Sequence, residues 1–480
     1  MNRISHWIDG KVSVSTSGRS GVVFDPATGE QQASVDFASV AEVDHAIAVA
    51  KAAFPAWRAT NLSRRAEVMF HMRELVAANR KEIASLLSKE HGKVLGDALG
   101  EVARGLENVE FACGIPQLLK GGYSEQASSG VDVYNIRQPL GVVAGITPFN
   151  FPAMVPMWMF ANALACGNTM VLKPSEKDPS ASMFLAELLK QAGLPDGVFN
   201  VLHGDKVAVD RLLEHPDIQA ISFVGSTPVA KYIYASAAAE GKRVQALGGA
   251  KNHLVVMPDA DLPKTVEAII GSAFGAAGER CLAGSVLVCV GDVAEPLLDL
   301  LIERVRNMNV GDGSRQGTDM GPLITAEHAG RVAGHIQRGI ADGAVPLADG
   351  RSLRTSLGSY FVGPTILDHA NPDMSVACDE IFGPVLTVLR VKTLDEAIQL
   401  VNRSRFGNAS SIFTDSGSAS REYTSRVEAG MVGVNIGVAA PMAFFPFAGW
   451  KQSFFGDLHA HGKDAVSFYT EQKVIMSRWF

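Results

Sequence analysis

Alternating strands and helices predict that this chain is an α/β protein with a doubly wound parallel sheet. Between residues 142 and 239, short apolar runs that suit buried strands alternate with longer segments of helical periodicity. The same rhythm returns between about residues 254 and 437, which predicts a second α/β domain. The 480 residues are 47% hydrophobic and 19% charged, a composition that suits large cores and excludes a disordered chain, a coiled coil or a disulfide-stapled scaffold.

The first 120 residues are predicted to be mostly helical after a short β segment. Residues 8–10 carry a hairpin signal. Ser39 and Glu42 form a capping box that begins a helix reaching to about Trp57. Helical patterns continue over residues 63–90 and 93–119, and the second has a buried stripe of Leu99, Val102, Leu106 and Val109. We expect Arg104 and Asn108 to lie off this stripe.

Polar or glycine-containing segments follow three of the strands predicted in the next part of the chain. The strands are expected at residues 142–146, 170–172, 198–202 and 220–224, with helices at 181–192, 207–213 and 229–239. The segments that follow them are 147–150, 173–176 and 225–227, and ligands of parallel sheets bind at such strand ends. Gly225-Ser226-Thr227 could cradle a phosphate before a helix, although the full GxGxxG pattern is absent and an ordinary turn is the alternative.

Charge and cysteine usage narrow the possible partners and location. A net charge of -7 argues against nucleic acid, and the 12 histidines show no metal-hydrolase spacing. The five cysteines are an odd number without a CxxC pair, which fits reduced thiols and a cytoplasmic protein. Residues 154–172 are uncharged, but Pro156, Asn162 and a turn at 166–169 interrupt them. We therefore predict a buried helix, a turn and a strand there, and no membrane partner.

Cys281 is the candidate nucleophile among the five cysteines. It follows Gly278-Glu279-Arg280 and has small neighbours. A neighbouring cation favours the thiolate, which is the reactive form of the side chain. For a lone cysteine the alternative is a buried core residue, and we assign that role to Cys113, Cys166, Cys289 and Cys378.

Several motifs in the same order and spacing resemble the NAD(P)-dependent aldehyde dehydrogenase superfamily over nearly the whole chain. They are Pro148-Phe-Asn-Phe-Pro152, Lys173-Pro-Ser-Glu176, Phe223-Val-Gly-Ser-Thr227, Leu247-Gly-Gly249, Gly278-Glu-Arg-Cys281 and Glu380-Ile-Phe-Gly-Pro384. The resemblance implies an aldehyde dehydrogenase fold with an NAD-binding domain at 1–120 and 141–246 and a catalytic domain at 247–440. It also implies a small β oligomerisation flap at 121–140 with residues 441–480, through which the family builds dimers and tetramers, and we expect a homotetramer. The tail at about 468–474 looks strand-like and is expected to pair with a partner subunit.

The resemblance also implies a role for each motif residue. Cys281 attacks the aldehyde, and the Asn150 amide with the Cys281 backbone N–H forms the oxyanion hole. Lys173 and Glu176 hold the adenosine ribose, and the Glu176 carboxylate favours NAD over NADP. Further cofactor contacts are implied for Ile146, Thr147, Pro148, Phe149, Gly225, Ser226, Leu247, Glu380 and Phe382. No metal ligand is implied.

The segment before Leu-Gly-Gly departs from the hydrolytic members of the superfamily. Those members have a Glu immediately before it that activates the deacylating water, whereas this chain has Ala246. A positioned base contributes about 10²–10⁴-fold to rate, so its loss disfavours hydrolysis, while a thiol acceptor needs less help. The segment Ala246 to His253 resembles the CoA-acylating methylmalonate-semialdehyde dehydrogenase branch, which implies coenzyme A as acyl acceptor. Replacement of the base by Glu279 is the alternative.

The substrates of that branch carry a carboxylate one carbon from the aldehyde carbon. Arginine suits a carboxylate better than lysine does, and Arg280 adjoins Cys281, while Arg104 resembles a position facing the substrate tunnel. We expect both to bind the carboxylate and Phe149 to wall the tunnel. The resemblance implies oxidation of malonate or methylmalonate semialdehyde, loss of CO₂ and formation of acetyl-CoA or propionyl-CoA. Valine and inositol catabolism are pathways that such an enzyme serves.

Two other functions stay open at this point. One is a hydrolytic NAD-dependent aldehyde dehydrogenase that produces a free carboxylic acid, which Ala246 disfavours. The other is a catalytically silent structural protein on the same fold. Retention of Cys281, Asn150, Lys173 and Glu176 argues against the second alternative, because a scaffold has no use for all of them.

Overall fold

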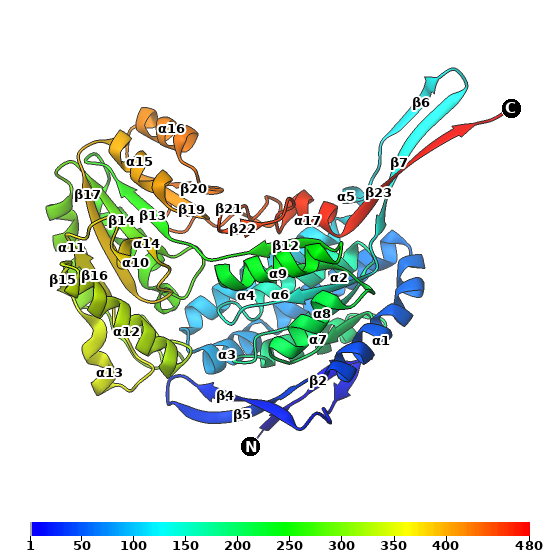
Figure 1. Cartoon of the computed structure of the whole chain (residues 1–480), viewed down its shortest axis with the longest axis horizontal. Coiled ribbons are helices and arrows are strands. Elements are labelled where there is room, and N and C mark those ends of the chain that lie inside the picture. The colour runs from blue at the N-terminus through cyan, green and yellow to red at the C-terminus, as the bar shows by residue number, and fades with distance from the viewer. Residues whose placement is uncertain (1) are drawn as a thin grey trace.

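Two large sheets, each with helices on both faces, organise the computed structural model, which describes residues 2–480 (Figure 1). Adjacent residues of one central strand show the double coverage: Val143 packs into one core, whereas Val142 and Ala144 pack into another. In the second sheet, Leu254 and Val255 face different cores in the same way. The prediction of a doubly wound α/β protein is therefore confirmed.

The first sheet has five parallel central strands, flanked by antiparallel ones. Its order is β22 (Phe454–Phe455), β12 (Arg243–Leu247), β11 (Ile218–Val224), β8 (Val142–Ile146), β9 (Thr169–Lys173), β10 (Phe199–Val201), β2 (His6–Ile8) and β3 (Lys11–Ser13). β2 and β3 form the hairpin predicted at residues 8–10. β22 comes from the 441–480 segment that we expected to serve oligomerisation, so part of that segment completes this sheet.

Helices cover this sheet and build the N-terminal part of the molecule. They are α1 (Val40–Ala59), α2 (Leu62–Ala78), α3 (Arg80–His91), α4 (Leu95–Cys113), α5 (Ile115–Leu118), α6 (Met154–Ala165), α7 (Ser180–Gln191), α8 (Lys206–Glu214) and α9 (Thr227–Ala239). The capping box of Ser39 and Glu42 is present at the start of α1. The prediction that Asn108 lies off the buried stripe is wrong, because this residue of α4 is fully buried.

The second sheet is parallel except at one edge. Its order is β15 (Val345–Ala348), β16 (Thr365–Asp368), β17 (Val385–Val391), β14 (Gly284–Val290), β13 (Asn252–Val256), β19 (Ala409–Phe413) and β20 (Met431–Val434). Its helices are α10 (Leu262–Phe274), α11 (Ala294–Arg306), α12 (Ala326–Ala341), α13 (Leu353–Ser356), α14 (Ser375–Cys378), α15 (Leu394–Arg403) and α16 (Gly417–Arg426).

A three-stranded antiparallel arm projects from the body beside the C-terminus (Figure 1). It contains β6 (Tyr123–Ser128), β7 (Val131–Pro139) and β23 (Thr470–Arg478). The tail strand begins later than predicted, because residues 462–468 form helix α17 (Gly462–Phe468), and it pairs with β7 of its own chain. Smaller β elements are β1 (Asn2–Ile4), β4 (Arg19–Asp25), β5 (Glu30–Phe37), β18 (Phe406–Gly407) and β21 (Trp450–Lys451).

The uncharged segment at 154–172 is a core element. Every residue of α6 is buried, and a turn leads from it directly into the central strand β9. Among residues 2–480, no helix is both long enough and apolar enough to cross a membrane.

Candidate active site

Cys281 follows a tight left-handed turn. The turn η1 (Gly275–Gly278) has positive φ angles at Ala276 (48°), Ala277 (52°) and Gly278 (73°). A Cβ on Gly278 would lie 2.3 Å from the carbonyl oxygen of Gly383, so only glycine fits there. The Ala276 N–H donates to the Asp97 carboxylate of α4 at 2.7 Å, which braces the turn from outside. Two non-glycine residues in this conformation store strain beside the nucleophile.

The Cys281 thiol is held in a largely buried place. The backbone carbonyl of Cys281 accepts hydrogen bonds from the side-chain amides of Asn252 and Asn408, each at 2.9 Å. Burial, followed by the charge of Glu380, raises the pKa of the thiol to about 12, and Arg280 lowers it by less. The Arg280 charge does favour the thiolate, as predicted, but burial has the larger effect and favours the protonated thiol.

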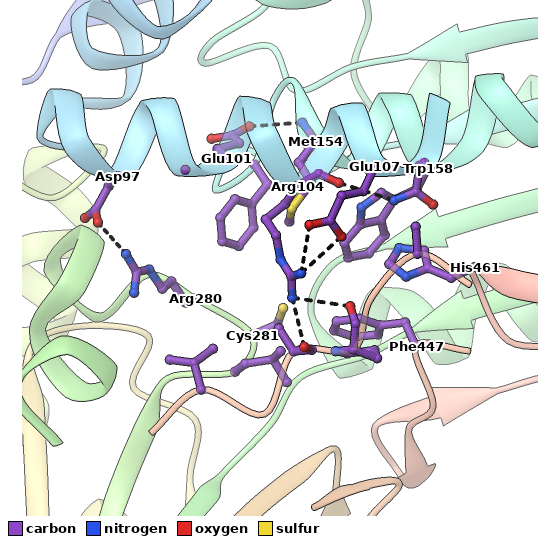
Figure 2. Close-up of a pocket in the computed structure, with 18 of the residues that line it drawn as sticks. Asp97, Glu101, Arg104, Glu107, Met154, Trp158, Arg280, Cys281, Phe447 and His461 are labelled. Carbon is purple, nitrogen blue, oxygen red and sulfur yellow. Dashed lines mark hydrogen bonds and ion pairs between the residues drawn. The ribbon is translucent and has the colours of Figure 1, made fainter. Parts of the chain in front are cut away.

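A cavity of about 230 Å³ opens on one side of Cys281 (Figure 2). This is smaller than the roughly 300–1,000 Å³ of sites for drug-sized ligands, so it suits a substrate of a few carbons. Helix α4 contributes Arg104 to its wall, and Arg280 lies at one end. At the other end the rings of Trp158, Phe447 and His461 pack against one another.

Both predicted arginines line this cavity, and each is already paired. Arg104 donates to both Glu107 oxygens at 3.1 and 3.2 Å and to the carbonyl of Ala440 at 2.8 Å. Arg280 donates to the Asp97 carboxylate at 2.7 Å. The spacing of Arg104 and Glu107 by three helical residues could have predicted their pair, whereas no sequence signal joined Arg280 to Asp97.

Phe149, which we expected to wall the tunnel, does not line this cavity. Its ring instead packs edge-on against Phe382 at 5.8 Å and stacks near His91 at 5.9 Å. Phe151, two positions later, does line the cavity with Cys281. The chain turns sharply between β8 and α6, so residues close in sequence face different sides of the nucleophile.

His461 is a lining residue that the sequence did not indicate. It is 4% exposed, and neither ring nitrogen has a hydrogen-bond partner within the described residues. Burial, followed by the charge of Arg104, lowers the pKa of the imidazole to about 3, so the ring is neutral at physiological pH.

The side chain of Leu247, and not that of Ala246, faces Cys281. Leu247 lines a second small cavity together with Cys281 and Asn150. Ala246 points to the opposite face of β12, into the core that holds Phe223. The assignment of Ala246 to the general-base position is therefore wrong, because successive residues of a strand alternate between faces. The conclusion that no carboxylate occupies this position stands, with Leu247 in its place.

Asn150 lines this second cavity and contacts Glu279, which does not line it. The Asn150 amide donates to the Glu279 carbonyl oxygen at 3.0 Å. The Glu279 carboxyl is fully buried, 3.6 Å from ring nitrogens of both His91 and His328, and burial raises its pKa to about 8. It lines neither cavity that contains Cys281, which argues against Glu279 as a substitute base.

The predicted cofactor residues gather along one edge of the first sheet. Ile146 at the end of β8 pairs in register with Lys173 of β9, and Val224 of β11 pairs with Leu247 of β12. The segments that follow these strand ends carry the other predicted residues: Thr147, Pro148, Glu176, Gly225 and Ser226. Parallel strands thus bring residues far apart in sequence to one edge.

Polar groups along this edge suit a dinucleotide. Lys173 and Glu176 form an ion pair at 3.2 Å. Burial acts to raise the pKa of Glu176, but the Lys173 charge opposes this effect and the pKa is lower than its usual value. Ser226 begins α9, and its side chain makes no capping bond there, so the helix N-terminus is free for an anion. The buried Thr147 hydroxyl has no partner within residues 2–480.

Glu380 and Phe382 complete the edge from the second sheet. The Glu380 carboxylate accepts from the Ala250 N–H at 2.8 Å, and a Cβ on Gly249 would lie 2.3 Å from it. Phe382 has a positive φ of 58° and packs against Phe149. The tight approach at Gly249 explains why glycine stands there.

Comparison with known proteins gives one consistent family. The model of the aldehyde dehydrogenase family matches residues 13–475. The malonate-semialdehyde dehydrogenase of Pseudomonas aeruginosa is 52% identical, covering 100% of this chain and 97% of that protein. Malonate-semialdehyde dehydrogenase 2 of Geobacillus thermodenitrificans is also 52% identical, with 99% of each covered.

Solved structures agree with this result. Methylmalonate-semialdehyde dehydrogenase from Oceanimonas doudoroffii superimposes with a TM-score of 0.98 at 50% identity, covering 100% of this chain and 99% of that one. A Sinorhizobium meliloti protein solved in complex with NAD gives the same TM-score of 0.98 and identity of 50%, with 100% and 98% covered. Together with the nucleophile turn and the strand-end edge described above, these matches show that the chain belongs to the aldehyde dehydrogenase family.

Proposed function

We propose that the protein oxidises malonate semialdehyde or methylmalonate semialdehyde with NAD, and transfers the decarboxylated acyl group to coenzyme A. The observation that carries this proposal is the presence of Arg104 and Arg280 in the same small cavity as Cys281. An aldehyde that binds there beside two guanidinium groups is expected to carry a carboxylate close to its reacting carbon. The names of the similar proteins in Pseudomonas and Geobacillus support this substrate class.

NAD is the cofactor that the strand-end edge fits. Lys173 and Glu176 offer a cation and a carboxylate for the adenosine ribose, and the start of α9 at Ser226 offers backbone N–H groups for the pyrophosphate. Glu380 and the wall made by Phe149 and Phe382 suit the nicotinamide end. The negative charge of Glu176 would repel a 2′-phosphate and so favours NAD over NADP.

In the proposed mechanism, Cys281 gives its thiol proton to solvent and its sulfur bonds to the aldehyde carbon. The oxyanion that forms is stabilised by the Asn150 amide and the Cys281 backbone N–H. NAD held by Lys173, Glu176 and Glu380 would supply the acceptor for the hydride of this carbon. The carbonyl then re-forms as a thioester on Cys281, with the substrate carboxylate still in place beside the arginines.

The next step releases CO₂ from the thioester. The bond between carbon 2 and the carboxylate breaks, its electrons form an enolate on the thioester oxygen, and carbon 2 then takes a proton from solvent. The thiolate of coenzyme A attacks the remaining thioester, and Cys281 leaves as a thiolate. Leu247 supports this order, because it places an apolar side chain where a base could otherwise activate water for hydrolysis.

The arm supports assembly into a homotetramer. The edge strand of the arm, β23, exposes the apolar side chains of Val474 (62%) and Met476 (75%), and an uncovered strand edge favours pairing with another copy. We further propose a cytoplasmic location and a role in valine or inositol catabolism, where such semialdehydes are consumed.

Product analysis tests the proposed function. Malonate or methylmalonate semialdehyde is supplied with NAD, with and without coenzyme A, and NADH and acyl products are followed by mass spectrometry. We expect a single burst of NADH without coenzyme A and sustained formation of acetyl-CoA or propionyl-CoA with it. Sustained turnover to a free acid without coenzyme A would instead identify a hydrolytic dehydrogenase, and absence of NADH would indicate a silent protein.

A further inference from the structure

The acidic residues of the substrate cavity bear on how a tightly bound carboxylate can leave. We propose that Asp97 and Glu107 weaken the hold of the cavity's arginines on the substrate carboxylate, so that this group can depart as CO₂. This inference rests on the proposed function. It makes both acids positioning residues, which act on the substrate through the arginines.

Both guanidinium groups are paired before any substrate enters. Arg104 shares one nitrogen with both oxygens of Glu107, at 3.1 and 3.2 Å, and its other terminal nitrogen donates to the carbonyls of Ala440 (2.8 Å) and Pro441 (3.3 Å). Arg280 donates to Asp97 at 2.7 Å, and both partners of this pair are mostly buried, with side chains 18% and 23% exposed. A substrate carboxylate must therefore share each arginine with a resident carboxylate.

The charges that line the cavity give no net positive potential. The lining includes Arg104 and Arg280 and three carboxylates: Asp97, Glu101 and Glu107. Glu101 is committed elsewhere, because it binds the buried Lys93 amine at 2.6 Å and caps the start of α6 through the Ala153 N–H at 2.8 Å. Two cations then face two acids, so the remaining charges of the lining balance.

This balance suits decarboxylation better than strong binding would. As the bond to CO₂ breaks, negative charge leaves the carboxylate and moves to the thioester oxygen. A contact that is stronger with the carboxylate than with the departing CO₂ raises the barrier, since only interactions that strengthen in the transition state accelerate the reaction. An arginine already paired with Asp97 or Glu107 orients the carboxylate with a weaker net attraction.

The test compares two variants that remove one acidic charge each. Glu107→Gln is the cleaner one, because in the part of the chain that the structure describes the Glu107 side chain bonds only to Arg104. Asp97→Asn retains an oxygen that can accept from the Ala276 N–H and so can keep the turn before Cys281 braced. Glu327→Gln is the control, because it removes the acid of an exposed pair with Arg331 on α12.

We expect malonate to bind the Glu107→Gln and Asp97→Asn proteins about 1.5- to 5-fold more tightly, the range for one competing charge in a partly exposed pair. Calorimetric titration measures this binding without turnover. In a single turnover with malonate semialdehyde and NAD, CO₂ release should be slower in both variants than in wild type. Glu327→Gln should match wild type throughout, and melting temperatures establish that all three proteins fold.

The outcomes separate this inference from the proposed function. If wild type oxidises malonate semialdehyde but both variants bind malonate equally well or more weakly, the acids only hold the arginines in place and the inference is wrong. If wild type neither oxidises malonate semialdehyde nor binds malonate, the proposed function itself is wrong.

Discussion

Placing a carboxylate at Leu247 should convert the protein toward hydrolysis. Leu247 ends β12, is 5% exposed and lines a cavity with Cys281 and Asn150. A Glu side chain there would point at the thioester, where it could activate water. The neighbouring Ala246 is fully buried on the other face of the strand, against Phe223, and a Glu at that position would point away from the reaction.

The size of the effect follows from two opposing contributions. A well-positioned general base is worth about 10²–10⁴-fold in rate. Burial raises the pKa of the introduced carboxyl above its usual value, so only a fraction of the carboxyl groups is ionised at pH 7 and able to act as a base. We therefore expect Leu247→Glu to increase turnover without coenzyme A by about 10- to 100-fold, and to increase it further as pH rises.

The assay follows NADH formation without coenzyme A, with the free acid identified by mass spectrometry. Leu247→Gln has nearly the same shape but no base, and should show no gain. The overpacking caused by Ala246→Glu should by itself lower the free energy of unfolding by about 1–3 kcal/mol. This variant should also show no increase in turnover without coenzyme A. Hydrolysis by Ala246→Glu but not by Leu247→Glu would refute the assignment of the two strand faces.

Three further outcomes are expected. Because burial raises the pKa of Cys281 to about 12, its alkylation by iodoacetamide in the protein without NAD should accelerate about tenfold for each pH unit between pH 7 and 10; a plateau near pH 8 would contradict this. Glu176→Gln should lower the kcat/KM preference for NAD over NADP, and an unchanged preference would remove Glu176 from the ribose site. Lys93→Met leaves the Glu101 carboxylate buried without its cation, so urea unfolding should show a loss of about 3–5 kcal/mol, whereas an unchanged midpoint would contradict a stabilising role for this pair.

The local pattern of the sequence was enough for the fold and for the set of residues that meet at the strand-end edge of the first sheet, where we propose that NAD binds. Apolar runs, capping signals and glycine turns act over a few residues, so they can be read from the chain directly. Strand ends that carry Thr147, Lys173, Gly225 and Leu247 had to meet at one edge once the strands were parallel, because parallel strands point the same way.

Local sequence patterns do not show which way a side chain points or which distant residue it contacts. Leu247 and Ala246 differ by one position, and only the packing of β12 between two cores shows which faces Cys281. Arg280 and Asp97 are far apart in sequence, and they meet because α4 crosses above the nucleophile turn. The sequence therefore determined which chemical groups the protein has and the elements that carry them. Their partners, their burial and hence the protonation of Cys281 depend on long-range packing, which no local pattern encodes.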